Sequence, residues 1–208
     1  SGNMIDLCPV GALTSKPFRY SARTWELSRR QSVSPHDSVG ANLIVQVKAN
    51  KVMRVVPLEN EDVNECWIAD RDRFSYEALN AASRLTQPMV KQGGVWQAVD
   101  WSTALAYVAD GLKRVMAEFG SAGIGAVGHA SSTVEELHLL AKLVRGLGSE
   151  SIDHRTRHAD FANTAPAGHA RWLGMPIASL SRLDRVFVVG SFLRKDHPLL
   201  AQRLRQAV

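Results

Sequence analysis

The amino-acid sequence predicts an α/β fold with an α+β start: a small β-hairpin module followed by part of a doubly wound parallel sheet. Two runs rich in β-forming residues, 42–47 and 51–57, are joined by a short polar turn, which indicates a hairpin. From residue 124 onward the pattern alternates between strand and helix, which favours a parallel sheet covered by helices. The run 185–190 is apolar and rich in valine, and it is the clearest candidate for a buried parallel strand.

The first part of the chain contains short elements. We expect residues 1–30 to form an extended connector with one short helical turn, and the polar run 28–38 to mark a boundary. Within the hairpin, Asn50 can adopt the positive φ angle that a tight turn requires. An acidic loop follows at 59–65, and the stretch 69–76 leads into a short helix.

A long amphipathic helix follows a turn at Gly93-Gly94. Asp100 or Ser102 can cap the N-terminus of this helix, and Gly120 ends it. Apolar residues recur along it at three- and four-residue steps and form one face. They are Ala104, Leu105, Val108, Leu112, Val115, Met116 and Phe119.

The alternation of strand and helix then proceeds in order. A short strand is expected at 124–128, and Ser132 with Glu135 has the spacing of a capping box for a helix that runs to about Leu147. After the valine-rich strand, a second amphipathic helix is expected at 198–205.

Composition places the chain among ordinary soluble globular proteins. Its 208 residues are 45% hydrophobic and 22% charged, and no run of about twenty apolar residues could form a transmembrane segment. The net charge of +5 is spread along the chain without a recognition motif or interleaved aromatics, so nucleic-acid binding is not expected. Two cysteines, Cys8 and Cys66, provide no disulfide framework and fit a reducing compartment.

Cys8 is the residue with the most distinctive context. Pro9 follows it directly, fixes φ and has no N–H to donate, which is how bacterial ferredoxins end the cysteine run that holds a 4Fe–4S cluster. Cys8 has no Cys-x-x-Cys partner in this chain. Either it is an ordinary buried thiol, or the chain begins partway through a larger protein that carries the other ligands.

The string 8–17, followed by 22–27, resembles the large iron–sulfur subunit of respiratory complex I, the proton-pumping NADH–quinone oxidoreductase. The resemblance implies that Cys8 is the last ligand of a 4Fe–4S cluster in a ferredoxin-like N-terminal region. It also implies that the other ligands, and further iron–sulfur clusters, lie in a region that precedes this chain. The fragment by itself is expected to bind no cluster.

The hairpin, the acidic loop and the Asp-Arg-x-Arg-Phe stretch resemble the first domain of the molybdopterin oxidoreductase superfamily. Members with a further 4Fe–4S cluster carry four cysteines in this domain. Fitting that pattern puts the ligand places on Ser34, Asp37, Ala41 and Ala69. None is a cysteine, so the resemblance implies that this second cluster is absent. Cys66 lies close to the last place and is interpreted as a packing thiol.

The order of motifs from residue 84 onward is similar to the entry into the α/β domain of the same superfamily. We therefore expect three parts: the end of the ferredoxin-like region with a connector (1–30), a small β-rich module without a cluster (31–83), and an incomplete molybdopterin-oxidoreductase-like α/β domain (84–208).

Three further motifs are not expected to carry chemistry. The string 123–128 matches G-x-G-x-x-G, but its glycines run into and through a strand and do not open a helix. His154 and His158 have i, i+4 spacing, but arginines stand between them, which disfavours a metal ion. The loop 190–194 with Arg203 resembles one that faces a guanine dinucleotide in catalytic members, yet a bound pterin is not expected here.

The resemblance implies a peripheral-arm subunit that relays electrons from NADH and flavin through iron–sulfur clusters towards quinone. Its partners would be other peripheral-arm subunits, and it would lie on the cytoplasmic side of the bacterial inner membrane. This fragment would mainly act as scaffold, with no turnover of its own. Two alternatives stay open: a fragment of a catalytic molybdopterin-dependent enzyme of the formate dehydrogenase or nitrate reductase type, and an interaction domain that has lost electron transfer.

Overall fold

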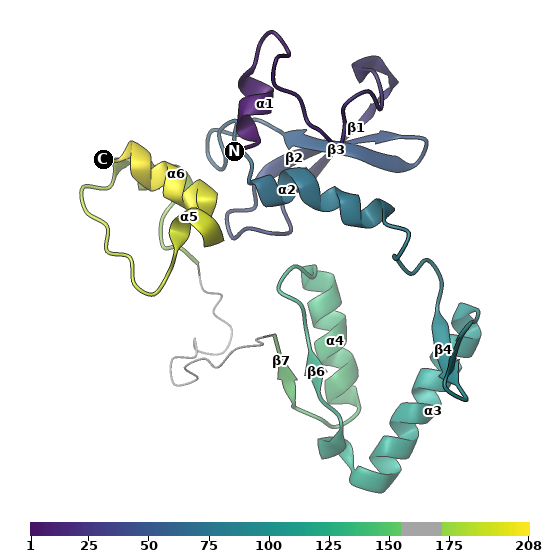
Figure 1. The fold of residues 1–208 in the computed structure, drawn as a ribbon. Coiled ribbons are helices and arrows are strands. Elements are labelled where there is room, and N and C mark those ends of the chain that lie inside the picture. The colour runs from purple at the N-terminus through teal and green to yellow at the C-terminus, as the bar shows by residue number, and fades with distance from the viewer. Residues whose placement is uncertain (155–171) are drawn as a thin grey trace. The chain divides into compact units, whose positions relative to one another are not determined.

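The computed structural model describes residues 1–154 and 172–208 (Figure 1). Contacts divide them into two units. One unit contains residues 1–84 together with the C-terminal residues from 172 on, and the other contains residues 85–154. Each unit is described by itself.

The first unit is built on a three-stranded antiparallel sheet in the order β1-β2-β3. Its strands are β1 (Ser28–Val33), β2 (Asn42–Lys48) and β3 (Lys51–Pro57). The predicted hairpin is confirmed by the pairing of β2 with β3. Asn50 adopts a positive φ of 59°, as expected, and Ala49 does so as well at 48°, so both central turn residues are left-handed.

Strand β1 was not predicted. The polar run 28–38 was interpreted as a boundary, but its first half pairs with β2 along its whole length, from Ser28 opposite Val47 to Val33 opposite Asn42. Every residue of β1 is exposed. An edge strand needs backbone hydrogen bonds but no apolar face, so no hydrophobic alternation marks it in the sequence.

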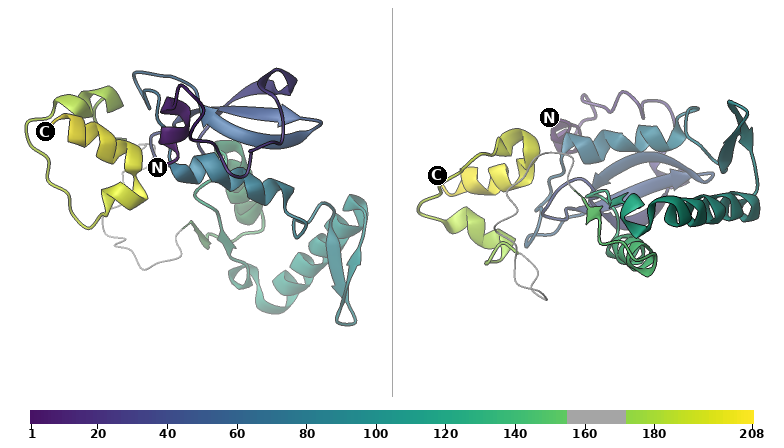
Figure 2. Two further views of the ribbon diagram at one scale, coloured as in Figure 1. Left: turned by 45° about the horizontal axis from the view of Figure 1, so that its top comes forward. Right: turned by 90° about the horizontal axis from the view of Figure 1, so that it is seen from below.

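Helical segments lie before and after this sheet in the chain, and those after it pack on β3 (Figure 2). Near the N-terminus they are α1 (Asn3–Leu7) and the 3₁₀ turn η1 (Thr24–Glu26), and after the sheet they are α2 (Asp70–Phe74) and its 3₁₀ continuation η2 (Ser75–Asn80). The core consists of Leu43, Val55, Ile68 and Tyr76, with Ile68 fully buried. The Asp-Arg-x-Arg-Phe stretch therefore forms the helix that packs on the hairpin.

The C-terminal segment of the same unit contains η4 (Ile177–Arg182), α5 (Leu193–Asp196) and α6 (Pro198–Gln206). The expected helix at 198–205 is confirmed by α6. The expected strand at 185–190 is wrong, because no described residue there forms a strand, and Phe187 is 91% exposed. A strand requires a neighbour to accept its hydrogen bonds, and this segment has no backbone partner among the described residues.

The second unit opens with a hairpin around Gly93 and Gly94 and a long helix. The hairpin strands are β4 (Met89–Gln92) and β5 (Val95–Ala98), and the helix is α3 (Trp101–Phe119), followed by the 3₁₀ turn η3 (Ser121–Gly123). The Asp100 carboxylate caps α3 by accepting from the Thr103 N–H at 2.7 Å, and Gly120 at φ 70° ends it. Both expectations are confirmed.

Two parallel strands and one helix complete this unit: β6 (Ala126–Val127), α4 (Val134–Gly146) and β7 (Ile152–Asp153). The alternation of strand, helix and strand is thus present, with strands of two residues. The capping box was predicted one residue too early, because Thr133 and Glu136 form it in place of Ser132 and Glu135. Mixed α/β character is confirmed, and the described sheet contains only these two parallel strands.

Candidate functional site

The Cys8 thiol lies in a turn of backbone N–H groups directly after α1. Its Sγ accepts a hydrogen bond from the N–H of Leu13 at 3.5 Å, and Gly11 allows the turn by adopting φ 67°. The N–H of Leu13 is the main cause that lowers the pKa of Cys8, with smaller contributions from the N–H groups of Val10, Ala12 and Gly11. The turn therefore stabilises a thiolate, which is the form that binds iron.

Cys8 is half-buried and carries no disulfide. A thiolate that accepts a backbone N–H bond fits a cluster ligand, since such bonds to the sulfurs tune iron–sulfur clusters. Among the described residues, no three His, Cys, Asp or Glu side chains could together hold a metal ion. Cys8 therefore has no companion metal ligands among the described residues.

Helix α1 carries the Cys8 turn and is attached to α2 by a polar cluster. The N–H of Gly2 donates to Asp70 Oδ1 at 2.6 Å, and Arg73 Nη2 donates to Asn3 Oδ1 at 3.0 Å and Asp6 Oδ2 at 2.6 Å. The Arg73 side chain is only 4% exposed. Sequence reasoning noted the Asp-Arg-x-Arg-Phe motif but did not connect Arg73 with Asn3 or Asp6.

The four places that correspond to cluster ligands in the superfamily lie in one region around Asp72. The N–H of Ser34 donates to Ala41 O at 2.8 Å, its hydroxyl donates to Asp72 Oδ1 at 2.6 Å, and the N–H of Asp72 donates to Ala69 O at 3.0 Å. The fourth place, Asp37, accepts through Oδ1 from the N–H groups of Val39 at 3.0 Å and Gly40 at 2.9 Å. Ser34, Ala41 and Ala69 are buried. A hydrogen-bonded network fills the region.

Asp72 is an unusual member of this network because it is only 2% exposed. Burial raises the pKa of its carboxyl, the hydrogen bond from Ser34 opposes that rise, and the charge of Asp37 adds to it. The second carboxylate oxygens of Asp72 and Asp37 are buried with no hydrogen-bond partner among the described residues.

Cys66 is exposed, so its interpretation as a packing thiol is wrong. It follows the acidic loop, and the neighbouring half-buried Trp67 donates through Nε1 to Glu65 Oε2 at 3.1 Å. Burial of part of the thiol and the charges of Glu65, Glu59 and Glu61 raise the pKa of Cys66. The pKa values of the two cysteines thus shift in opposite directions, downward for Cys8 and upward for Cys66.

The remaining motifs do not form a site in the described residues. Gly123 belongs to η3 and Gly128 follows β6, well before α4 begins at Val134, so the glycine string does not open a helix, as expected. A Cβ at Gly128 would lie 2.8 Å from Leu137, which explains this glycine by close packing. His154 is described, but His158 lies outside the described residues.

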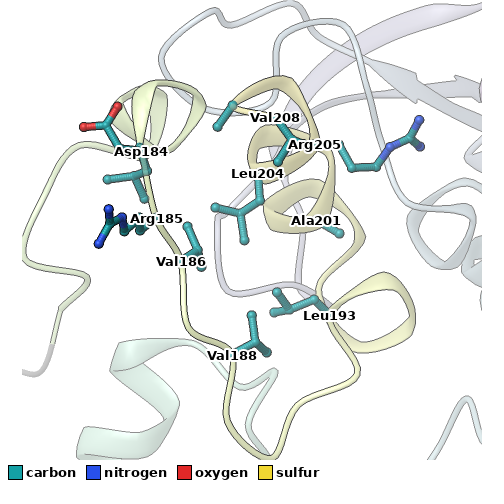
Figure 3. Close-up of a pocket in the computed structure, with 11 residues that line it drawn as sticks. Asp184, Arg185, Val186, Val188, Leu193, Ala201, Leu204, Arg205 and Val208 are labelled. Carbon is teal, nitrogen blue, oxygen red and sulfur yellow. The ribbon is translucent and has the colours of Figure 1, made fainter.

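Arg203, which the sequence groups with the loop 190–194, has a structural role. Arg203 of α6 pairs with Glu65 at 2.9 Å and donates to the carbonyl oxygens of Glu61 and Val63, which attaches the C-terminal helix to the acidic loop. An apolar cavity of about 670 Å³ lies beside α6. Val186, Val188 and Leu204 point into it, and Asp184 and Arg185 point away (Figure 3).

Comparison with known families places both halves of the chain. Residues 84–208 match the family profile "Molybdopterin oxidoreductase", and residues 27–77 match "NADH-ubiquinone oxidoreductase NDSU1/NuoG-like, 4Fe-4S domain". The chain belongs to the molybdopterin oxidoreductase family. Within that family its homologues are the large iron–sulfur subunits of NADH–quinone oxidoreductase, of the 75 kDa type, as the resemblance of the Cys8 string predicted.

Three curated relatives illustrate the similarity. The NADH-ubiquinone oxidoreductase 75 kDa subunit of Reclinomonas americana is 34% identical over 99% of this chain and 31% of its own length. The mitochondrial NADH-ubiquinone oxidoreductase 78 kDa subunit of Candida albicans is 35% identical over 99% of the chain and 28% of its own length. The mitochondrial NADH dehydrogenase [ubiquinone] iron-sulfur protein 1 of Solanum tuberosum is 37% identical over 100% of this chain and 27% of its own length. The chain spans a little less than a third of the length of these relatives.

The described helices include none that is both long and apolar enough to cross a membrane.

Proposed function

We propose that the chain is part of the electron-transferring iron–sulfur subunit of NADH–quinone oxidoreductase, and that Cys8 is a thiolate ligand to one iron of a 4Fe–4S cluster. The observation that carries the role of Cys8 is its turn, in which the N–H of Leu13 bonds to Sγ and lowers the pKa of the thiol. The other ligands would come from residues that precede this chain in a longer protein, as would further clusters.

The cluster, when bound, supplies one-electron transfer between NADH-derived flavin electrons and quinone. The residues of this chain contribute the thiolate of Cys8, the N–H groups of Leu13 and Val10 that favour its negative charge, and the fixed φ of Pro9 that limits its approach. Residues 31–208 would serve as scaffold and as a docking surface for other peripheral-arm subunits. We place the protein at the cytoplasmic side of the bacterial inner membrane, held there through these partners.

We also propose that the small module (31–83) binds no second cluster, although its profile is named for a 4Fe–4S domain. Serine, aspartate and two alanines stand at the places where ligands would be needed, and Ser34 is engaged with Asp72. Alanine has no atom that can bind iron. We also propose three parts with the boundaries 1–30, 31–83 and 84–208, and the family matches to residues 27–77 and 84–208 support them.

Metal analysis of the longer protein tests the proposal. It is isolated anaerobically as the wild type, as Cys8→Ser and, as a matched control, as Cys66→Ser. Iron without molybdenum, with about four fewer irons per protein in Cys8→Ser and no change in Cys66→Ser, is the expected result. Stoichiometric molybdenum would identify a catalytic molybdopterin enzyme instead, and iron that is unchanged by Cys8→Ser would make Cys8 a simple thiol.

A further inference from the structure

We propose that Arg73 is the positioning residue of Cys8: it holds α1 on the small module and thereby sets where the thiolate stands. This inference rests on the proposed role of Cys8 as an iron ligand. It concerns residues that lie far apart in the sequence, since Arg73 and Asp6 are separated by 67 positions.

The need for such a residue follows from the length of α1. The helix contains five residues, and a single turn of this kind is not stable by itself in water. It also lacks a side-chain cap at its N-terminus, and none of its residues is buried. The direction in which Cys8 leaves this helix therefore depends on what the helix is attached to.

Arg73 supplies the main attachment. One guanidinium nitrogen bonds both Asn3 and Asp6, which lie three residues apart and so on one face of α1. Because the Arg73 side chain is 4% exposed and that of Asp6 is 28% exposed, this charge-assisted bond is shielded from water and from salt. Two acceptors on one helix face restrict both the position of α1 and its rotation.

Asn3 extends the attachment into the core of the module. Its side chain donates to Ile68 O at 3.0 Å and accepts from Ile68 N–H at 3.3 Å, and Ile68 is the fully buried residue of the hydrophobic cluster. Gly2 permits the close approach, since a Cβ there would lie 2.5 Å from Cδ of Arg73. A continuous path of contacts therefore joins the core, Arg73, α1 and Cys8.

A matched control lies two residues away on the same helix. Arg71 is exposed and donates to the carbonyl oxygens of His36 at 3.3 Å and Lys195 at 3.1 Å. Arg71→Gln thus removes an arginine of α2 without removing the bonds to Asn3 and Asp6. Arg73→Lys is the conservative variant, because an ammonium can still pair with Asp6.

The first measurement uses the 208-residue chain without metal. Amide hydrogen exchange is followed in the wild type, Asp6→Asn, Arg73→Gln and Arg71→Gln. We expect exchange of the α1 amides to become at least about tenfold faster in Asp6→Asn, with β2 and β3 unchanged, and no such change in Arg71→Gln. Asp6→Asn keeps the result interpretable if Arg73→Gln unfolds the module. Unchanged exchange in α1 of Asp6→Asn would overturn the proposal.

The second measurement uses the longer protein with its iron. We expect Asp6→Asn and Arg73→Gln to release the iron of one cluster to a chelator several-fold faster and to change the electron paramagnetic resonance spectrum of that cluster, with partial recovery in Arg73→Lys. If Arg73 only stabilised the module, the spectrum of the cluster would stay unchanged. An unchanged spectrum would therefore contradict the proposal. If Cys8→Ser loses no iron while α1 is still released in Asp6→Asn, the attachment stands and the proposed function fails.

Discussion

Ser34 and Asp72 lie 38 positions apart in the chain, yet the Ser34 hydroxyl donates a 2.6 Å hydrogen bond to Oδ1 of Asp72. This buried contact joins the loop before β2 to helix α2. The second oxygen of Asp72 has no hydrogen-bond partner among the described residues. The loop and the helix are thus connected through a carboxylate that is costly to ionise.

This arrangement predicts a pH-dependent stability. Burial raises the pKa of Asp72 above its ordinary value of 3.8, so the folded chain binds this proton more tightly than the unfolded chain. The free energy of unfolding should therefore fall as the pH rises from the pKa of Asp72 in the unfolded chain to its higher pKa in the folded chain. Above the pKa of the folded chain, Asp72 should cause no further change. Asp72→Asn should be more stable than the wild type at pH 7 and should lack this fall.

Urea unfolding at several pH values between about 4 and 8 measures this effect. Asp62→Asn, in the exposed acidic loop, is the matched control and should follow the wild type. Parallel pH profiles of the wild type and Asp72→Asn would contradict the prediction.

The Arg203 side chain attaches α6 to the acidic loop through its ion pair with Glu65, so its removal should destabilise the chain. Arg203→Ala removes a buried cation that also donates to two carbonyl oxygens, which should cost about 3 kcal/mol of the free energy of unfolding. Arg205→Ala, at an exposed position of the same helix, should cost little. Urea unfolding measures the loss of free energy of unfolding in each variant. Equal losses in Arg203→Ala and Arg205→Ala would show that Arg203 has no special role.

The capping box of α4 predicts a difference between adjacent residues. Thr133→Ala removes the hydroxyl that accepts from the Glu136 N–H at 3.2 Å and should destabilise the chain by about 1 kcal/mol. Ser132→Ala should have a much smaller effect. Thermal unfolding of the two variants measures the difference, and a larger loss in Ser132→Ala would restore the capping box predicted from the sequence.

The opposite pKa shifts of the two cysteines predict an order of alkylation. Backbone N–H groups lower the pKa of Cys8, and partial burial with acidic neighbours raises that of Cys66. In the metal-free chain, iodoacetamide at about pH 7 should therefore modify Cys8 before Cys66, although Cys66 is the more exposed. At about pH 10 the difference in rate should become small. Mass spectrometry of digested samples measures both rates, and faster modification of Cys66 at neutral pH would contradict the shifts.

The sequence by itself determined the elements whose cause is local. The β2–β3 hairpin follows from two β-rich runs and the tolerance of Asn50 for a positive φ angle. Helices α3 and α6 follow from apolar spacing, from Asp100 as a cap and from Pro198 at a helix start. The resemblance of the Cys8 string identified the family for the same reason, because a motif is a property of neighbouring residues.

Only the tertiary structure decided the rest. Strand β1 forms because β2 offers its backbone, whereas the more apolar run 185–190 forms no strand because no neighbour pairs with it among the described residues. The attachment of the Cys8 turn depends on Arg73 and Asp6, whose proximity no local pattern records. Pairing and ion-pair formation depend on which groups the fold brings together, and that is a property of the whole packed chain.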